Sequence, residues 1–165
     1  MKVLISAFNK SNDLLTHINN HAELYDRITA LGLTPQPVDG VWKGVSEFSY
    51  MVHGVTAVMV KEFYAMARDF NQEAILLVAD DNRAAVVPTD GPVMAPMIDV
   101  GDWREVSKDI AIQFDGYTKT RDGRYYVAAT REQFGLATRR LLATQASVIA
   151  ANEYAARVNA AGISS

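Results

Sequence analysis

The strongest candidate for chemistry in this sequence is Glu47, a carboxylate on a short segment of alternating side chains. Residues 45–53 (VSEFSYMVH) place aromatic and β-branched side chains at every second position, which predicts a β-strand. Glu47 then falls on the face opposite Phe48, so it can point into a cleft while Phe48 packs in the core. A single Glu on a strand is more often a solvated or salt-bridged residue, and that interpretation stays open. Its candidate neighbours are Ser6, Asn9, Ser49 and Tyr50.

The rest of the sequence limits the chemistry that Glu47 could perform. The chain contains no G-x-G-x-x-G, P-loop, H-E-x-x-H or G-x-S-x-G motif, and it has no Cys. His17 and His21 lie one helical turn apart, but no third ligand is spaced to complete a metal site, so we expect surface or boundary histidines. We therefore expect no metal and no cofactor, and a reaction that needs few protein groups.

Length and charge indicate the class of protein. With 165 residues, 49% hydrophobic and 21% charged, the chain is typical of one globular domain. A formal net charge of −3 gives no basic surface for nucleic acid or an anionic membrane. No apolar run is long enough to span a bilayer, and the N-terminus does not resemble a signal peptide. We expect a cytoplasmic protein with a small-molecule partner.

Hydrophobic periodicity predicts the elements that position Glu47. Continuous apolar runs predict buried strands over residues 2–8 and 74–79. Apolar residues at helical spacing predict helices over residues 14–31 and 59–70. Residues 34–40 contain two prolines and are expected to form an edge strand or a crossing loop.

The second half of the chain predicts hairpins and a long helix. Residues 84–87 follow a polar turn and are expected to pair with the strand before it, whereas residues 90–102 are expected to form an irregular connection. Residues 114–119 and 124–127 predict a further hairpin. From Arg131 the sequence is rich in Ala and Leu, which predicts a helix whose small residues would allow close packing within the chain or between chains.

Together these elements predict an α+β fold. Strand, helix, strand, strand, helix, strand is the β-α-β-β-α-β order of a ferredoxin-like antiparallel sheet, here with an added β-hairpin and a long C-terminal helix. We therefore predict a ferredoxin-like catalytic domain over residues 1–127 and a C-terminal helical extension of the same domain over residues 128–165.

Three stretches, taken in order, resemble the bacteriophage S-adenosylmethionine lyases, the anti-restriction enzymes formerly described as S-adenosylmethionine hydrolases. The first is residues 3–8 (VLISAF). The second is residues 40–43 (GVWK) with Glu47, followed by residues 71–78 (NQEAILLV). The third is residues 102–108 (DWREVSK) with the hairpin that ends at residue 127. The resemblance covers residues 3–127 and leaves out the C-terminal helix.

The resemblance implies a reaction and an assembly. The carboxylate of S-adenosylmethionine would displace methylthioadenosine from its own chain and give L-homoserine lactone, with positioning supplying most of the acceleration. The ferredoxin-like sheet would assemble as a homo-oligomer, a trimer, with the substrate bound between neighbouring subunits. The biological role would be to counter methylation and restriction in the cytoplasm of a host cell.

The resemblance also implies roles for particular residues. Glu47 takes the place of the family's essential Glu and would hold the ammonium end of the substrate. Trp42 is the nearest match to a Tyr that the family carries before that Glu, and it could offer a cation–π face but no phenolic hydroxyl. Substrate contacts are expected at the end of the first strand and nearby, from Ser6, Ala7, Phe8, Asn9, Ser49, Tyr50 and Gln72.

Two other functions remain open from the sequence. The first is a non-catalytic protein of the same fold that binds a small molecule or another protein, with Glu47 used for binding only. The second is a structural phage protein in which the Ala-rich helix drives assembly. For Gln72 in particular, a hydrogen bond at the end of a helix is as good an interpretation as a ligand contact.

Overall fold

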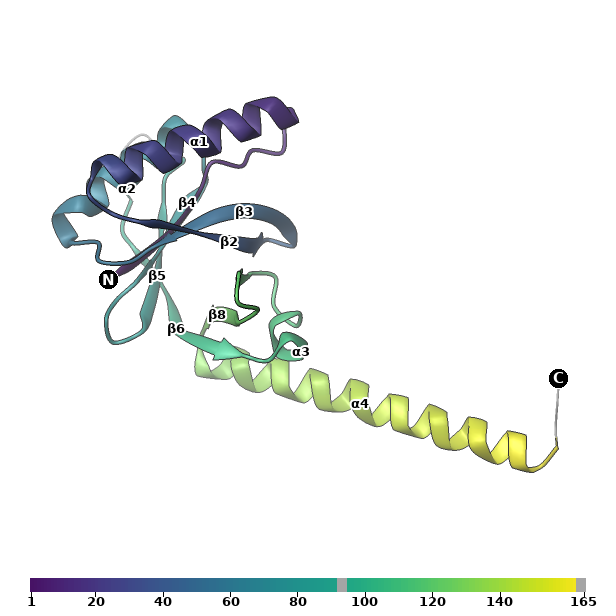
Figure 1. The fold of residues 1–165 in the computed structure, drawn as a ribbon. Helices are drawn as coiled ribbons and strands as arrows, with labels where there is room; N and C mark the ends of the chain where they lie inside the picture. The colour runs from purple at the N-terminus through teal and green to yellow at the C-terminus, as the bar shows by residue number, and fades with distance from the viewer. Residues whose placement is uncertain (92–94, 163–165) are drawn as a thin grey trace.

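The polypeptide forms a closed antiparallel barrel, with α1 and α2 on one side and α3 and α4 on the opposite side (Figure 1). The structure is a computed structural model, and it describes residues 1–91 and 95–162. The strands follow one another around the barrel in the order β1-β3-β2-β7-β8-β6-β5-β4. Their bounds are β1 Lys2–Ser6, β2 Pro35–Trp42, β3 Val45–Val52, β4 Ala74–Val78, β5 Arg83–Pro88, β6 Ile98–Val106, β7 Tyr117–Thr120 and β8 Tyr125–Ala129. The helices are α1 Leu14–Ala30, α2 Val60–Asp69, α3 Lys108–Ala111 and α4 Arg131–Ala160, with a 3-10 turn, η1 Ala57–Met59, before α2.

The prediction of an open ferredoxin-like sheet is wrong. Strands β4, β1, β3 and β2 do neighbour one another in that order, but the sheet continues through β5, β6, β8 and β7 until it closes on itself. The closing contact is the pairing of β2 with β7, from Val38 opposite Thr120 to Val41 opposite Tyr117. Closure removes both free edges of the sheet, which an open ferredoxin-like sheet would leave exposed.

Strand β2 is an interior strand of this barrel, although its prolines suggested an edge. Pro35 and Pro37 pair with β3, and both precede Val38, where the pairing with β7 begins. The missing proline N–H groups therefore lie outside the segment that is hydrogen-bonded on both sides.

The connection expected over residues 90–102 is also partly wrong. Strand β6 begins at Ile98, and residues 92–94 lie outside the described part of the chain. The register between β5 and β6 shifts between Ala84 and Ala85, and Gly101 opposite this shift has a φ of +102°. A bulge with a left-handed glycine interrupts the regular alternation, which explains why the sequence does not read as a strand there.

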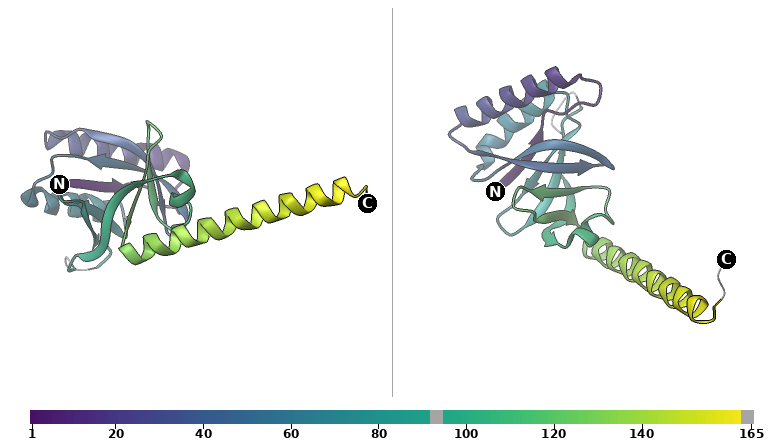
Figure 2. Two further views of the ribbon diagram at one scale, coloured as in Figure 1. Left: turned by 90° about the horizontal axis from the view of Figure 1, so that it is seen from below. Right: turned by 45° about the vertical axis from the view of Figure 1, so that its right-hand side comes forward.

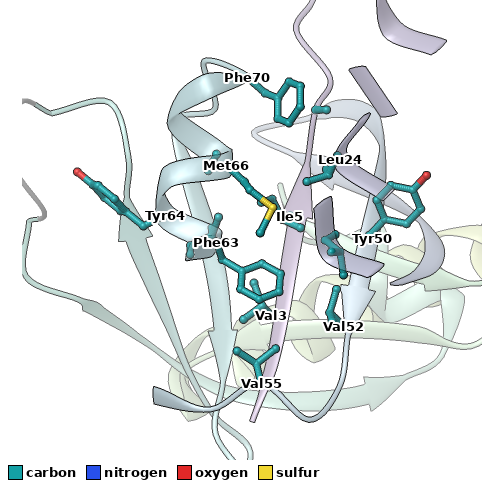
Figure 3. Close-up of a cluster of buried hydrophobic side chains, with 14 of the residues drawn as sticks. Val3, Ile5, Leu24, Tyr50, Val52, Val55, Phe63, Tyr64, Met66 and Phe70 are labelled. Atoms are coloured by element: carbon teal, nitrogen blue, oxygen red, sulfur yellow. The ribbon is translucent and has the colours of Figure 1, made fainter. Parts of the chain in front are cut away.

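Two hydrophobic clusters lie on the two sides of the sheet. In the larger cluster, α1 and α2 cover the outer face of β1 and β3, where Ile5, Leu24 and Met66 converge with Phe63 and Val52 (Figure 3). The smaller cluster fills the barrel interior with Leu4, Val38, Met51, Val78, Ala84 and Trp103. Alternate residues of β3 therefore face the helices and the barrel interior in turn.

Helix α4 starts against the barrel and then leaves it (Figure 2). Thr130 and Gln133 form a capping box at its first turn, which satisfies two of the free N–H groups there. The ring centroid of Phe134 lies 5.6 Å from that of Phe114, next to α3. None of the described helices combines the length and hydropathy needed to cross a bilayer.

Candidate functional site

The β2–β3 hairpin positions the candidate carboxylate. Its strands pair from Pro35 opposite Val52 to Trp42 opposite Val45, which places Gly40 directly across from Glu47. The turn needs two residues with positive φ, and Lys43 (+50°) and Gly44 (+77°) supply them. A two-residue turn of this kind matches the twist of the strands and fixes the register.

Glu47 lies on the face of β3 that looks into the barrel. It alternates with Phe48 and shares its face with Ser49 and with Met51, which belongs to the interior cluster. A Cβ atom on Gly40 would stand 3.7 Å from Cγ of Glu47 and 3.3 Å from Oγ of Ser49. The absence of a side chain at Gly40 therefore leaves the space that Glu47 and Ser49 occupy.

The environment of Glu47 favours its protonated form. Burial, together with the charge of the Glu73 carboxylate, raises the pKa of Glu47 from 4.5 to about 7. When a carboxyl group is partly removed from water, a cation that binds next to it stabilises its charged form more strongly than it would in water.

The turn between β2 and β3 contacts the residue that precedes β4, at one open end of the barrel, which we call the barrel mouth. Nζ of Lys43 and Nε1 of Trp42 both donate to Oε2 of Glu73, at 2.5 and 3.5 Å, and Glu73 directly precedes β4. Lys43 and Trp42 together lower the pKa of Glu73, which keeps its carboxylate charged near Glu47. We call Trp42, Lys43 and Glu73 the clasp.

Two predicted substrate contacts, Ser6 and Ser49, lie on the same inward face as Glu47. Ser6 at the end of β1 pairs with Ser49, and both are buried. However, Oγ of Ser6 donates to the carbonyl of Phe48 at 2.6 Å and accepts from the N–H of Phe8 at 2.9 Å. Ser6 therefore holds the ends of β1 and β3 together.

Three further predicted contacts hold the chain after β1. Ala7 is fully buried in the helix-side cluster, so its side chain is not accessible. Oδ1 of Asn9 accepts from the N–H and Oγ of Ser11 and closes a local turn. Nε2 of Gln72 donates to the carbonyl of Phe8 at 2.6 Å, which ties β1 to the end of α2. Gln72 therefore makes a hydrogen bond at the end of a helix, which was one of the two interpretations that the sequence left open.

The outer face of the same strands carries an open groove. It encloses about 920 Å³ between α1 and strands β2, β3, β7 and β8, and Glu47 borders it as well as facing the barrel interior. Phe8 and Tyr50 from the predicted set line it, and the hydroxyl of Tyr50 donates to the carbonyl of His21 at 3.3 Å. The groove is rich in aromatic and imidazole rings: Phe8, His17, His21, Phe48, Tyr50, Tyr117 and Tyr125.

The histidine pair belongs to this groove. The His17 ring stacks on Phe8, with centroids 4.6 Å apart and planes within 5°. Both ring nitrogens of His21 lie within 3.0 Å of backbone carbonyl oxygens, those of His17 and Phe48. Within residues 1–91 and 95–162, no cluster of three or more His, Asp or Glu side chains could hold a metal ion.

Sequence reasoning missed several residues of the site. Gly40 carries no chemical signal, and its role follows only from the cross-strand pairing with Glu47. Glu73 belongs to a polar break in the sequence, and its position beside Trp42 and Lys43 depends on contacts between segments about 30 residues apart. The sequence predicts a hairpin that contains Tyr117 and Tyr125, but only the pairing of β2 with β7 brings that hairpin to the groove.

The arrangement suits an organic cation with an aromatic part. Glu47 offers negative charge at a partly desolvated position, where an ammonium or sulfonium group is attracted more strongly than in water. The rings that line the groove offer stacking surfaces and cation–π faces.

The comparisons with known proteins agree with this chemistry. A family model described as the S-Adenosylmethionine lyase family matches residues 3–129, from β1 to the end of β8. The chain therefore belongs to the S-adenosylmethionine lyase family. At the level of the family it is a lyase that acts on S-adenosylmethionine, which confirms the resemblance found in the sequence. No curated protein matches the chain.

Proposed function

We propose that this protein cleaves S-adenosylmethionine to 5′-methylthioadenosine and L-homoserine lactone. The observation that carries the proposal is Glu47, a half-buried carboxylate with a pKa of about 7 within the segment that the family model matches. Both ring nitrogens of His21 are already engaged with backbone carbonyls and the His17 ring is stacked on Phe8, so a reaction that needs only positioning and charge fits the site best.

The step balances without any proton transfer from the protein. A carboxylate oxygen of the substrate attacks its own γ-carbon, the bond between that carbon and sulfur breaks, and its electron pair neutralises the sulfonium. The substrate ammonium is unchanged, so the lactone keeps one positive charge and methylthioadenosine is neutral. Glu47 holds the ammonium so that the carboxylate lies behind the carbon–sulfur bond.

The clasp would shield Glu47 from water, and the groove would bind the adenine of the substrate. The Trp42 ring lies at the barrel mouth, next to the hairpin turn, and limits the access of water to Glu47. Phe8 and Tyr50 offer ring surfaces for the adenine in the groove. Ser6, Ala7, Asn9 and Gln72 act indirectly, because their contacts fix the end of β1 beside Glu47.

The groove is open to solvent, which favours a site completed by a second subunit. We include in the proposal a homotrimer that binds the substrate between neighbouring chains. A phage-encoded enzyme of this kind would deplete the methyl donor of the host and counter restriction. S-adenosylmethionine is the substrate, and the reaction uses no other cofactor.

Product analysis with one pair of variants tests the function. We expect the wild-type protein to release methylthioadenosine from S-adenosylmethionine, and Glu47→Gln to lose at least about 100-fold in turnover because the ammonium loses its counter-charge. Glu153→Gln, an exposed carboxylate on α4, is the matched control and keeps full activity. Binding of the substrate by the wild type without any product would instead support a non-catalytic binding protein.

A further inference from the structure

Helix α4 carries an apolar face that its own chain does not cover. The helix runs from Arg131 to Ala160, and its first turns pack on the body, where the Arg104 guanidinium lies 4.8 Å from the centroid of the Phe134 ring. Ala137 is buried and Leu141 is half-buried. Residues 142–157 are all exposed, and the C-terminal part of the helix projects away from the barrel (Figures 1 and 2).

The residues that pack on the body begin a seven-residue repeat that continues along the free part of the helix. Steps of three and four residues from Phe134 reach apolar side chains at every position except one threonine: Phe134, Ala137, Leu141, Thr144, Val148, Ala151, Ala155 and Val158. We call this row the seam. A sustained repeat of this kind is the pattern of helices that supercoil around one another.

The free part of the seam is accessible in the single chain. Val148 is 55% exposed, and Ile149 and Leu142 beside the seam are 58% and 59% exposed. A row of apolar side chains on one projecting helix loses contact with water only when another helix lies along it. The alanines at two successive seam positions, Ala151 and Ala155, allow the two backbones to approach closely.

The charges on α4 favour a second copy of the same helix as the partner. The positions that flank the seam between Thr144 and Val158 are uncharged, whereas Arg140 flanks the part of the seam that packs on the body; the uncharged flanks are Gln145, Ser147, Asn152, Tyr154 and Asn159. The charged residues Glu153 and Arg157 lie away from the seam. Two identical helices can therefore pack along the free seam without like charges facing each other. A partner helix with charged flanks would have no opposite charges to pair with on this segment.

From the repeat, its exposure and its uncharged flanks, we propose that residues 144–158 form a coiled coil with the same segment of another copy of this chain. This segment lies outside residues 3–129, which the family model matches, and the proposal does not depend on the reaction. It adds an assembly element at the C-terminus that is separate from any contact made by the barrel.

Amide hydrogen exchange of the full-length protein tests the coil directly. An isolated helix end exchanges rapidly, so we expect amides of residues 144–158 to be protected at high protein concentration and to lose protection on dilution. Val148→Lys should lower their protection by about tenfold or more and leave the barrel strands unchanged. Ala146→Lys, on the opposite side of the helix, is the control and should keep the protection.

Helix propensity predicts the reverse order for these two variants, which makes the comparison decisive. Lys is a better helix former than Val and a slightly poorer one than Ala, so a helix that stays alone would be strengthened by Val148→Lys. Unprotected amides in the wild type at all concentrations would overturn the proposal. Equal loss of protection in both variants would overturn it as well, because the seam would then not be the contact.

Discussion

Burial and the carboxylate of Glu73 act on Glu47 in the same direction, and both make its negative charge costly. Glu47 in the free protein is therefore protonated in a large fraction of molecules near neutral pH, since its pKa is about 7. A bound ammonium or sulfonium would reverse this balance, because opposite charge lowers the pKa of a carboxyl. Substrate binding should thus expel the proton and leave the charged carboxylate that the reaction needs.

The raised pKa of Glu47 should also make the free energy of unfolding depend on pH. Because the folded-state pKa lies above the usual value of 4.5, the stability contributed by protonated Glu47 is complete below pH 4.5 and is lost as the pH rises through about 7. Relative to wild type, Glu47→Gln should gain on the order of 2 kcal/mol between pH 4.5 and pH 8, after allowance for solvent screening. Urea unfolding of both proteins at the two pH values measures it.

The outcome that contradicts this account is a parallel pair of stability curves. If the two proteins differed by the same amount at both pH values, Glu47 would ionise as freely in the folded chain as in the unfolded one. Glu153→Gln serves as the control, since it removes an exposed carboxylate and should not change the slope.

Burial of Glu47 and, to a smaller extent, the charge of Glu73 should together set the pH at which the enzyme works. We expect kcat/KM of the wild type to rise with pH to a plateau above about 7, as Glu47 ionises in the free protein. Glu73→Gln removes the like charge, so the midpoint of this rise should move to lower pH. The pH profile of methylthioadenosine formation measures both midpoints. An unchanged midpoint in Glu73→Gln would show that the Glu73 charge does not affect the ionisation of Glu47.

At this scale the sequence singled out Glu47 as a candidate, which stays a prediction, but it did not show the surroundings of this residue. Alternation along residues 45–53 placed Glu47 opposite Phe48, and in the structure Phe48 and Tyr50 pack in the helix-side cluster whereas Met51 packs in the barrel interior. The partners of Glu47 come from strands distant in sequence, so neither the space at Gly40 nor the charge of Glu73 could be inferred. Tyr50 was expected as a neighbour, yet it alternates to the helix side, where its hydroxyl bonds the carbonyl of His21.

At the scale of elements, strand pairing decides what the site contains. Local periodicity was enough to find β1, β3, β4 and β8, because each alternates or is continuously apolar. It could not show that β2 pairs with β7, since pairing depends on contacts between segments far apart in the chain. Strand β6 was not predicted at all, and the bulge at Gly101 contributes to this miss because it breaks the two-residue period.

Gly101 should be one of the most sensitive positions for stability. Its φ is +102°, and a Cβ atom there would lie 2.2 Å from the carbonyl carbon and oxygen of Ala129. Gly101→Ala should lower the free energy of unfolding by about 3 kcal/mol or more, because backbone strain and a clash with β8 add together.

A second glycine with positive φ allows the cost of backbone strain to be measured without the cost of a clash. Gly123 in the β7–β8 turn also has a positive φ, +85°, but a Cβ atom there would meet nothing within 4 Å. Gly123→Ala should therefore cost only about 1 kcal/mol, from backbone strain alone. Thermal or urea unfolding measures both variants, and equal losses would mean that the contact with Ala129 relaxes at little cost.

At the scale of the whole molecule, the barrel closes its own sheet and leaves the groove beside Glu47 open. Enclosing a substrate there would require a neighbouring chain, as the proposed trimer provides. Activity per chain should then fall on dilution, in step with the fraction of trimer seen by sedimentation. Full activity in a sample that is wholly monomeric would show that one chain completes the site.

The central claim is that the nucleophile is the substrate's own carboxylate and not water. The most direct test is turnover of S-adenosylmethionine in water enriched in oxygen-18, with products identified by mass at early times. We predict homoserine lactone without the heavy isotope, and any homoserine formed later should carry it only in the carboxyl group. Heavy oxygen in the side-chain hydroxyl of homoserine would mean that water attacked the γ-carbon, and it would contradict the proposed mechanism.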